Sequence, residues 1–118
     1  MHFDRDKINR DKEFPIIVTL CGSTRFLEAF QKAQLEKTLE GEIVLTIGSI
    51  AKSDAELFAN FSQAEVHRFK SELDELHKRK IDISDYIFVL NVGGYIGEST
   101  RSEIDYANKI GVEVRYLE

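Results

Sequence analysis

The chain has 118 residues, 42% of them hydrophobic and 31% charged, which fits one globular domain, 14–118, behind a polar N-terminal arm, 1–13. Its net charge of −5 argues against binding to duplex nucleic acid or to an anionic membrane surface, because both partners need clustered Lys and Arg. One cysteine permits no internal disulfide, and no apolar run approaches the roughly 20 residues of a membrane span, so we expect a cytoplasmic protein.

The first predicted strand is a nearly unbroken apolar run, Ile16–Cys21, which ends at Gly22. Such a run is typical of a central parallel strand that is buried on both faces. A helix is expected next, capped by Ser23 or Thr24 and ended by Gly41. Its apolar side is formed by Phe26, Phe30 and Ala33.

A second strand is predicted over Glu42–Ile47, and 49–60 is expected to form a loop with a helical turn. The pattern from about Ser62 to Lys80 is helical, with one apolar stripe whose members are spaced three and four apart: Val66, Phe69, Leu73 and Leu76. Two interpretations of the stripe are open. It packs against the sheet in the core, or it forms a helix–helix seam in a homodimer.

The third predicted strand, Tyr86–Leu90, is followed by a glycine-rich loop, a helix over about Arg101–Lys109, and a last strand, Val112–Leu117. Strands that alternate with helices imply a parallel sheet with helices on both faces. We therefore predict an α/β fold, a three-layer flavodoxin/Rossmann-like sandwich with a parallel sheet of four to five strands.

Ligands of open parallel sheets bind outside the carboxyl ends of the strands, where the strand order reverses. Gly22–Arg25 lies at this edge, and its glycine, its two hydroxyls (Ser23, Thr24) and the Arg25 guanidinium suit a phosphate or a carboxylate. The alternative is an ordinary helix cap with a solvated arginine.

The second segment at this edge is Gly93–Glu103, in which Ser99 and Thr100 are expected to cap the next helix. Its predicted ligand-binding residues are Gly94, Gly97, Glu98, Ser99, Thr100 and Arg101. The Glu103 carboxylate can attack an anomeric carbon as the base departs, because an anion stabilises an oxocarbenium-like transition state. The competing interpretation is a capping box, in which Glu103 bonds back to the Thr100 amide.

Metal and cofactor sites are not expected. His67 and His77 lie ten residues apart on one helix, and no cysteine or carboxylate cluster is expected to complete a site with them. Cys21 is interpreted as a buried structural thiol rather than a nucleophile. His77 can still point into the cleft.

Several segments resemble the nucleoside 2-deoxyribosyltransferase-like superfamily, which includes the deoxyribonucleoside 5′-monophosphate N-glycosidases. Leu20–Arg25 is similar to their Cys-Gly-Ser-x-Arg loop, Ser84–Leu90 to their Ala-Asp plus apolar strand, and Ser102–Ala107 to the start of the helix that carries their nucleophile. Val112–Leu117 is similar to their closing strand. The glycine loop also looks like the Gly-Gly-x-Gly-Thr-x-x-Glu motif of the "Lonely Guy" phosphoribohydrolases, with residues inserted.

The resemblance implies a flavodoxin-like fold in which Glu103 forms a glycosyl-enzyme ester and Gly22, Ser23 and Arg25 line the pocket. The chain departs from the family where Arg101 replaces a small residue, and where His77 stands in the place of a sugar-positioning aspartate. Asp74, one turn earlier, is a substitute for that aspartate. The chain is also shorter than most of the transferases.

These observations predict cleavage or transfer at the N-glycosidic bond of a (deoxy)nucleoside or its 5′-monophosphate, with catalytic roles for Glu103 and for His77 or Asp74. The alternative is a non-catalytic nucleotide-binding or sensing module on the same fold. The expected partners are a small-molecule nucleoside or nucleotide and further copies of the chain, in a homodimer or a higher homo-oligomer.

Overall fold

The computed structural model describes residues 14–47, 56 and 58–118, so the predicted arm and most of the predicted loop at 49–60 lie outside the described residues. The strands are β1 (Ile17–Cys21), β2 (Ile43–Leu45), β3 (Tyr86–Val89) and β4 (Glu113–Tyr116). The helices are α1 (Leu27–Leu39), α3 (Gln63–Asp82) and α4 (Glu98–Ile110), with a short 3-10 turn, η2 (Val92–Gly94), after β3. None of the described helices has the length and apolar composition of a membrane span.

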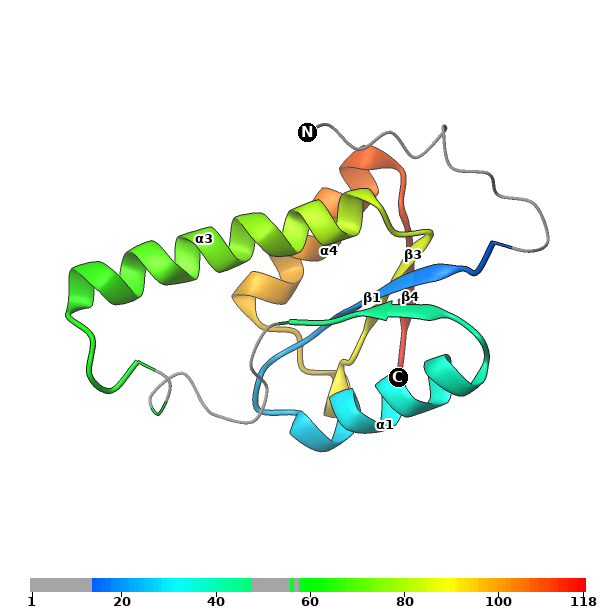
Figure 1. The fold of residues 1–118 in the computed structure, drawn as a ribbon, viewed down its shortest axis with the longest axis horizontal. Helices are drawn as coiled ribbons and strands as arrows, with labels where there is room; N and C mark the ends of the chain where they lie inside the picture. The colour runs from blue at the N-terminus through cyan, green and yellow to red at the C-terminus, as the bar shows by residue number, and fades with distance from the viewer. Residues whose placement is uncertain (1–13, 48–55, 57) are drawn as a thin grey trace.

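All the strand pairs are parallel, and the strand order is β2-β1-β3-β4. Helix α1 covers one face of the sheet, and α3 and α4 cover the other (Figure 1). The predicted α/β fold is confirmed, with four strands in the sheet. The chain moves outward from β1 to β2, returns to β3 on the other side of β1, and so reverses the strand order between β1 and β3.

The sheet separates two hydrophobic cores, because alternate residues of a strand point to opposite faces. The core on the α1 side contains Val18, Leu20, Phe30, Ala33, Tyr86 and Leu90. The core on the α3 and α4 side contains Cys21, Ile81, Ile87, Val89, Ile104, Ala107 and Val112. All five residues of β1 are buried, which confirms that it is a central strand.

Helix α1 begins later than predicted. Its N-cap is Phe26, whose side chain makes no capping hydrogen bond, so the prediction that Ser23 or Thr24 caps the helix is wrong. The Ser23 hydroxyl instead accepts hydrogen bonds from the backbone N–H and the Nε of Arg25, at 3.3 and 3.2 Å. The local turn therefore uses the hydroxyl before the helix starts.

Helix α4 begins at Glu98, three residues before the predicted start, with Gly97 as its N-cap. Gly97 has extended backbone angles and provides no side-chain cap, so Ser99 and Thr100 lie inside the first turn. The predicted capping box is wrong, because Glu103 stands in the second turn, where no free amide awaits its carboxylate. Glu103 is buried instead.

The apolar stripe of α3 does not pack in the core as one of the two interpretations expected. Leu73 is 45% exposed and Leu76 is 51% exposed, whereas the residues that this helix buries are His77 and Ile81. Leu73 and Leu76 lie in the C-terminal half of the helix, where they border a cavity at the edge of the sheet, and the N-terminal half extends past the end of the sheet (Figure 1). Near its N-terminus the ring of Phe69 stacks on that of Phe58, with 6.5 Å between the centroids.

Candidate functional site

A cavity of about 370 Å³ lies at the carboxyl ends of β1, β2 and β3. The loop after β1, the C-terminal half of α3, and the start of α4 all contribute to its wall. It is the edge of the sheet at which the sequence predicts a ligand, and it flanks the point where the strand order reverses. The lining residues are Gly22, Ser23, Thr24, Ile47, Phe58, Lys70, Leu73, Asp74, Leu76, His77, Lys80, Tyr95, Gly97, Glu98, Ser99, Thr100 and Glu103.

Three of the predicted site residues do not line this cavity: Arg25, Gly94 and Arg101. The Arg25 guanidinium lies 4.3 Å from the centre of the Tyr95 ring. Tyr95 lines the cavity, whereas Arg25, which the sequence predicts there, does not. Arg101 is exposed on α4, on a different side of the helix from Glu103. Gly94 is exposed in η2, where its φ of 80° serves the turn of the chain.

Gly22 lines the cavity for a reason that the sequence does not reveal. A Cβ atom at this position would lie 3.2 Å from the Leu90 Cβ and 3.3 Å from the Leu90 carbonyl oxygen. The absence of a side chain therefore allows the ends of β1 and β3 to approach each other. Close packing of the strands, in addition to any ligand, requires the glycine.

A buried group of three side chains forms the deepest part of the site. The Cys21 Sγ lies 3.4 Å from the His77 Nε2, and the same nitrogen lies 3.6 Å from a Glu103 carboxylate oxygen. The three come from β1, α3 and α4, and each is at most 7% exposed. The expectation that no cysteine or carboxylate would accompany His77 is therefore wrong.

Burial sets the protonation of this trio. Desolvation, followed by repulsion from Asp74, raises the pKa of Glu103 to about 8. Desolvation and then the charge of Lys80 lower the pKa of His77 to about 4. Desolvation and the nearby Glu103 also raise the pKa of the Cys21 thiol well above its usual range. At neutral pH the trio is therefore a thiol, a neutral imidazole and a largely protonated carboxyl group.

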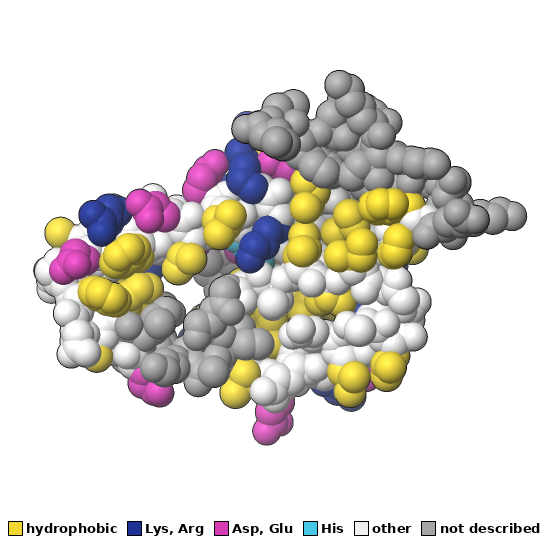
Figure 2. All heavy atoms as spheres, in the orientation of Figure 1, with side chains coloured by type: hydrophobic (Ala, Val, Ile, Leu, Met, Phe, Trp, Pro, Cys, Tyr) yellow, Lys and Arg dark blue, Asp and Glu magenta, His cyan; other side chains and the backbone are white. Residues whose placement is uncertain are grey.

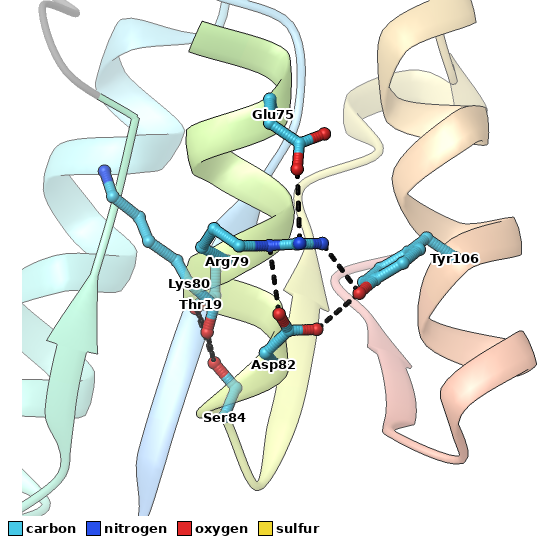
Figure 3. A network of polar contacts seen from close by, with 7 residues as sticks. All are labelled: Thr19, Glu75, Arg79, Lys80, Asp82, Ser84 and Tyr106. Atoms are coloured by element: carbon cyan, nitrogen blue, oxygen red, sulfur yellow. Dashed lines mark hydrogen bonds and ion pairs between the residues drawn. The ribbon is translucent and has the colours of Figure 1, made fainter. Parts of the chain in front are cut away.

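A second polar network connects α3 to α4 (Figure 3). Arg79 donates to the Tyr106 hydroxyl on α4 at 2.8 Å, and its Nε lies 3.0 Å from an Asp82 carboxylate oxygen. The Tyr106 hydroxyl donates in turn to Asp82. Arg79 also pairs with Glu75 one turn earlier, at 3.2 Å. These contacts connect the two helices at the protein surface, where the Arg79 side chain is 51% exposed.

The start of α4 offers donors to an anion. The N-cap residue, Gly97, has no side chain to cap the helix. The amides of the first turn, at Glu98, Ser99 and Thr100, therefore have no side-chain cap. The hydroxyls of Ser23 and Thr24 lie across the same cavity. The arrangement suits a phosphate group or the hydroxyl groups of a sugar.

Sequence reasoning missed several cavity residues, among them Tyr95 and the α3 residues Lys70, Leu73, Leu76 and Lys80. A signal for the α3 residues exists, because Lys70, Asp74, His77 and Lys80 recur at spacings of three and four. That polar row runs beside the apolar stripe, which gives the stronger periodic signal. Nothing in the sequence distinguishes Tyr95 from any other loop aromatic residue.

Comparison with protein-family models, with curated proteins and with solved structures finds no match to this chain. The resemblance to the nucleoside 2-deoxyribosyltransferase-like superfamily therefore stays a prediction, carried by short motifs.

Proposed function

We propose that the cavity binds a (deoxy)nucleoside or its 5′-monophosphate and that Glu103 acts at the N-glycosidic bond. The observation that carries the proposal is the position of Glu103, a buried carboxyl group in the wall of a cavity at the switch point of the sheet. The cavity volume of about 370 Å³ falls in the range typical of small-molecule sites.

The proposed reaction is a displacement at the anomeric carbon. The Glu103 carboxylate bonds to that carbon as the bond to the base breaks, and the base leaves with the electron pair and takes up a proton. Water, or a second base in a transfer reaction, then releases the sugar from the ester. The amides at the start of α4 and the hydroxyls across the cavity receive the phosphate or the sugar.

Ionisation of Glu103 has to precede the attack, because a protonated carboxyl group is a poor nucleophile. Its pKa of about 8 leaves only a minority of the molecules ionised at pH 7 in the ligand-free protein. Neutral His77, with a pKa of about 4, can accept a hydrogen bond from the acid but carries no charge to favour ionisation. We therefore place the best activity on the alkaline side of neutrality.

The test is a panel of nucleosides and nucleoside 5′-monophosphates, in ribo and deoxy forms, with release of free base as the readout. Glu103→Gln, which keeps the shape of the side chain, is expected to lower the rate by at least about a thousandfold. Asp105→Asn, an exposed change two residues along the same helix, is the matched control and is expected to keep the full rate. Full activity in the Glu103→Gln variant would end the nucleophile proposal.

A nucleotide sensor without turnover is the second candidate, favoured by the protonated state of Glu103 and by His77 in place of an aspartate. In that case nucleotides raise the melting temperature of the protein in proportion to the logarithm of their concentration, and no base is released. Base release at any pH rules the sensor out, and the absence of any thermal shift excludes both candidates.

We also propose that the protein forms a homodimer through the apolar stripe of α3, Val66, Phe69, Leu73 and Leu76. Hydrophobic side chains gather along this helix in Figure 2, and Leu73 and Leu76 are each about half exposed, at 45% and 51%. Surface of this kind is typical of an interaction site.

Light scattering on the purified chain tests the dimer. Phe69→Glu is expected to give a folded monomer, and Ser71→Glu, which changes the opposite side of the helix, is expected to remain dimeric. A monomeric wild-type chain at micromolar concentration contradicts the proposal. Far-ultraviolet circular dichroism checks that Phe69→Glu is folded.

A further inference from the structure

We propose that Cys21, His77 and Glu103 form a binding site for a zinc ion, with a fourth coordination position open to the cavity. The proposal goes beyond the glycosidase reaction and does not rest on it, because it concerns what the trio can hold rather than what the cavity can cleave. It also changes the expectation of a metal-free chain.

The spacing of the donor atoms fits a tetrahedral zinc ion. Zinc–sulfur bonds of about 2.3 Å and zinc–nitrogen or zinc–oxygen bonds of about 2.0 Å place neighbouring ligand atoms roughly 3.3 to 3.6 Å apart. In the protein the Cys21 Sγ and the His77 Nε2 are 3.4 Å apart, and the His77 Nε2 and the Glu103 oxygen are 3.6 Å apart. All three donor atoms lie within 4.8 Å of one another. Small side-chain movements therefore suffice to place an ion between them.

The donor types select zinc over the common hard cations. A thiolate and an imidazole bind Zn²⁺ well, whereas Mg²⁺ and Ca²⁺ prefer a shell made only of oxygen atoms. On binding, the Cys21 thiol and the Glu103 carboxyl group each release a proton to solvent. His77 binds through the Nε2 lone pair, so its proton resides on Nδ1. The two anions balance the charge of Zn²⁺, and no electron is transferred.

The burial of the trio is asymmetric, which gives the proposed ion its open side. His77 and Glu103 line the cavity, whereas Cys21 is completely buried behind them in the strand. An ion therefore enters from the cavity and keeps a water molecule on that side. Three protein ligands and an open position are typical of accessible zinc sites rather than of closed structural ones.

The buried Nδ1 of His77 is a second observation that the hydrogen bonds among the described residues leave unexplained. It has no hydrogen-bond partner, although nearly all buried polar atoms of a folded protein have one. A histidine that binds zinc through Nε2 normally donates its Nδ1 proton to a second acceptor. The Leu20 backbone lies near enough to favour a proton on the ring, so a small rotation on zinc binding supplies that acceptor.

Cobalt is the probe for the site, because Co²⁺ takes up zinc sites and its spectrum reports the ligands. Titration of the untagged, chelator-treated full chain with Co²⁺ is expected to give one equivalent of strong four-coordinate visible bands and a thiolate charge-transfer band. Added Zn²⁺ is expected to remove both. A spectrum no stronger than that of aqueous Co²⁺ overturns the proposal.

Single substitutions assign the ligands. Cys21→Ser is expected to lose the charge-transfer band, and His77→Gln and Glu103→Gln to weaken Co²⁺ binding by at least about tenfold. The matched controls are His67→Gln, on the exposed side of α3, and Glu98→Gln, a carboxylate that lines the same cavity outside the trio. Both are expected to bind Co²⁺ as the unaltered chain does.

The Co²⁺ spectra test the zinc site whether or not the chain is a glycosidase. If Cys21→Ser keeps the charge-transfer band, or if either control loses it, the assignment is wrong. A folded Cys21→Ser protein is verified by its circular dichroism and melting curve. If the chain does release base from nucleotides, one equivalent of Zn²⁺ is expected to inhibit it, because a zinc-bound Glu103 cannot attack a sugar carbon.

Discussion

Thr19 and Cys21 lie two residues apart on the same face of β1, but the polar atoms around Thr19 are fully hydrogen-bonded and those around Cys21 are not. The Thr19 hydroxyl lies 2.6 Å from the Ser84 hydroxyl, which in turn donates to the Lys80 carbonyl at 2.8 Å (Figure 3). Thr19 also reaches that carbonyl at 3.4 Å. Each of these polar atoms has a hydrogen-bond partner, so the Thr19 group stabilises the contact between β1 and the end of α3.

The group around Cys21 is less well satisfied. Its two contacts are 3.4 and 3.6 Å long, the His77 Nδ1 has no hydrogen-bond partner among the described residues, and all three ionisable groups have shifted pKa values. Burial alone therefore does not mark a ligand-binding site. A buried polar group that is fully paired stabilises the fold, whereas one left imperfectly paired beside a cavity is available for a ligand.

The largest effect that we expect from this difference is that the free energy of unfolding depends on pH through the ionisation of Glu103. The unfolded chain ionises this residue above about pH 4.5, but the folded chain keeps its proton up to about pH 8. Unfolding therefore releases a proton between these values, so stability falls as pH rises. Between pH 6.5 and 8.5 the fall attributable to Glu103 is about 2 kcal/mol.

Urea unfolding with a chelator present, at both pH values, measures this fall. Glu103→Gln cannot ionise, so its free energy of unfolding should depend less steeply on pH and should exceed that of the unaltered chain at pH 8.5. Asp105→Asn, the exposed control, should keep the original slope. Equal slopes in the Glu103→Gln variant and the unaltered chain would show that the Glu103 carboxyl group is ordinary.

The rate of the proposed reaction should depend on pH in the opposite sense. A nucleophile with a pKa of about 8 is mostly protonated at pH 7 and mostly ionised at pH 9. The rate of base release is therefore expected to rise about tenfold over this interval. Rates at saturating nucleotide, with a chelator present, test this. A rate that falls over the same range would instead assign Glu103 the role of an acid that protonates the leaving base.

Thr19→Val should separate the two groups. The change removes the hydroxyl bonded to Ser84, but Ser84 keeps its bond to the Lys80 carbonyl, so we expect a loss of about 1 kcal/mol in the free energy of unfolding. Nucleotide and Co²⁺ binding should not change. Thr38→Val, at an exposed position of α1, is the control and should leave stability nearly unaltered. Loss of ligand binding in Thr19→Val would mean that the two groups act as one.

The strands and the sandwich could be predicted because the signals are local. A five-residue buried strand such as Ile17–Cys21 is encoded by a nearly unbroken apolar run, and alternation of strands and helices predicts a parallel sheet. The same rule fixes the ligand edge of the sheet. These inferences need no knowledge of which distant residues meet.

The start of α3 could be predicted, because its N-cap is Ser62. The starts of α1 and α4 and the trio could not, for physical reasons. The N-caps of these two helices are Phe26 and Gly97, whose side chains offer no capping oxygen, and the Ser23 hydroxyl is used in a turn before α1. Cys21 and His77 are 56 residues apart, so no spacing reveals their contact. Periodicity identified the apolar face of α3 but could not tell how far the sheet extends beneath it.

The smallest effect expected concerns the surface network that connects α3 to α4. Arg79 contacts Glu75, Asp82 and Tyr106, but its side chain is 51% exposed, so solvent screens the ion pairs and Arg79→Ala should cost only about 0.5 kcal/mol. Lys32→Ala, which removes a more exposed ion pair to Glu36 with 3.9 Å between nitrogen and oxygen, should cost less still. If Arg79→Ala instead weakens Co²⁺ binding as strongly as a ligand substitution does, the surface network positions the trio, and the separation between structural and ligand-binding polar groups no longer holds.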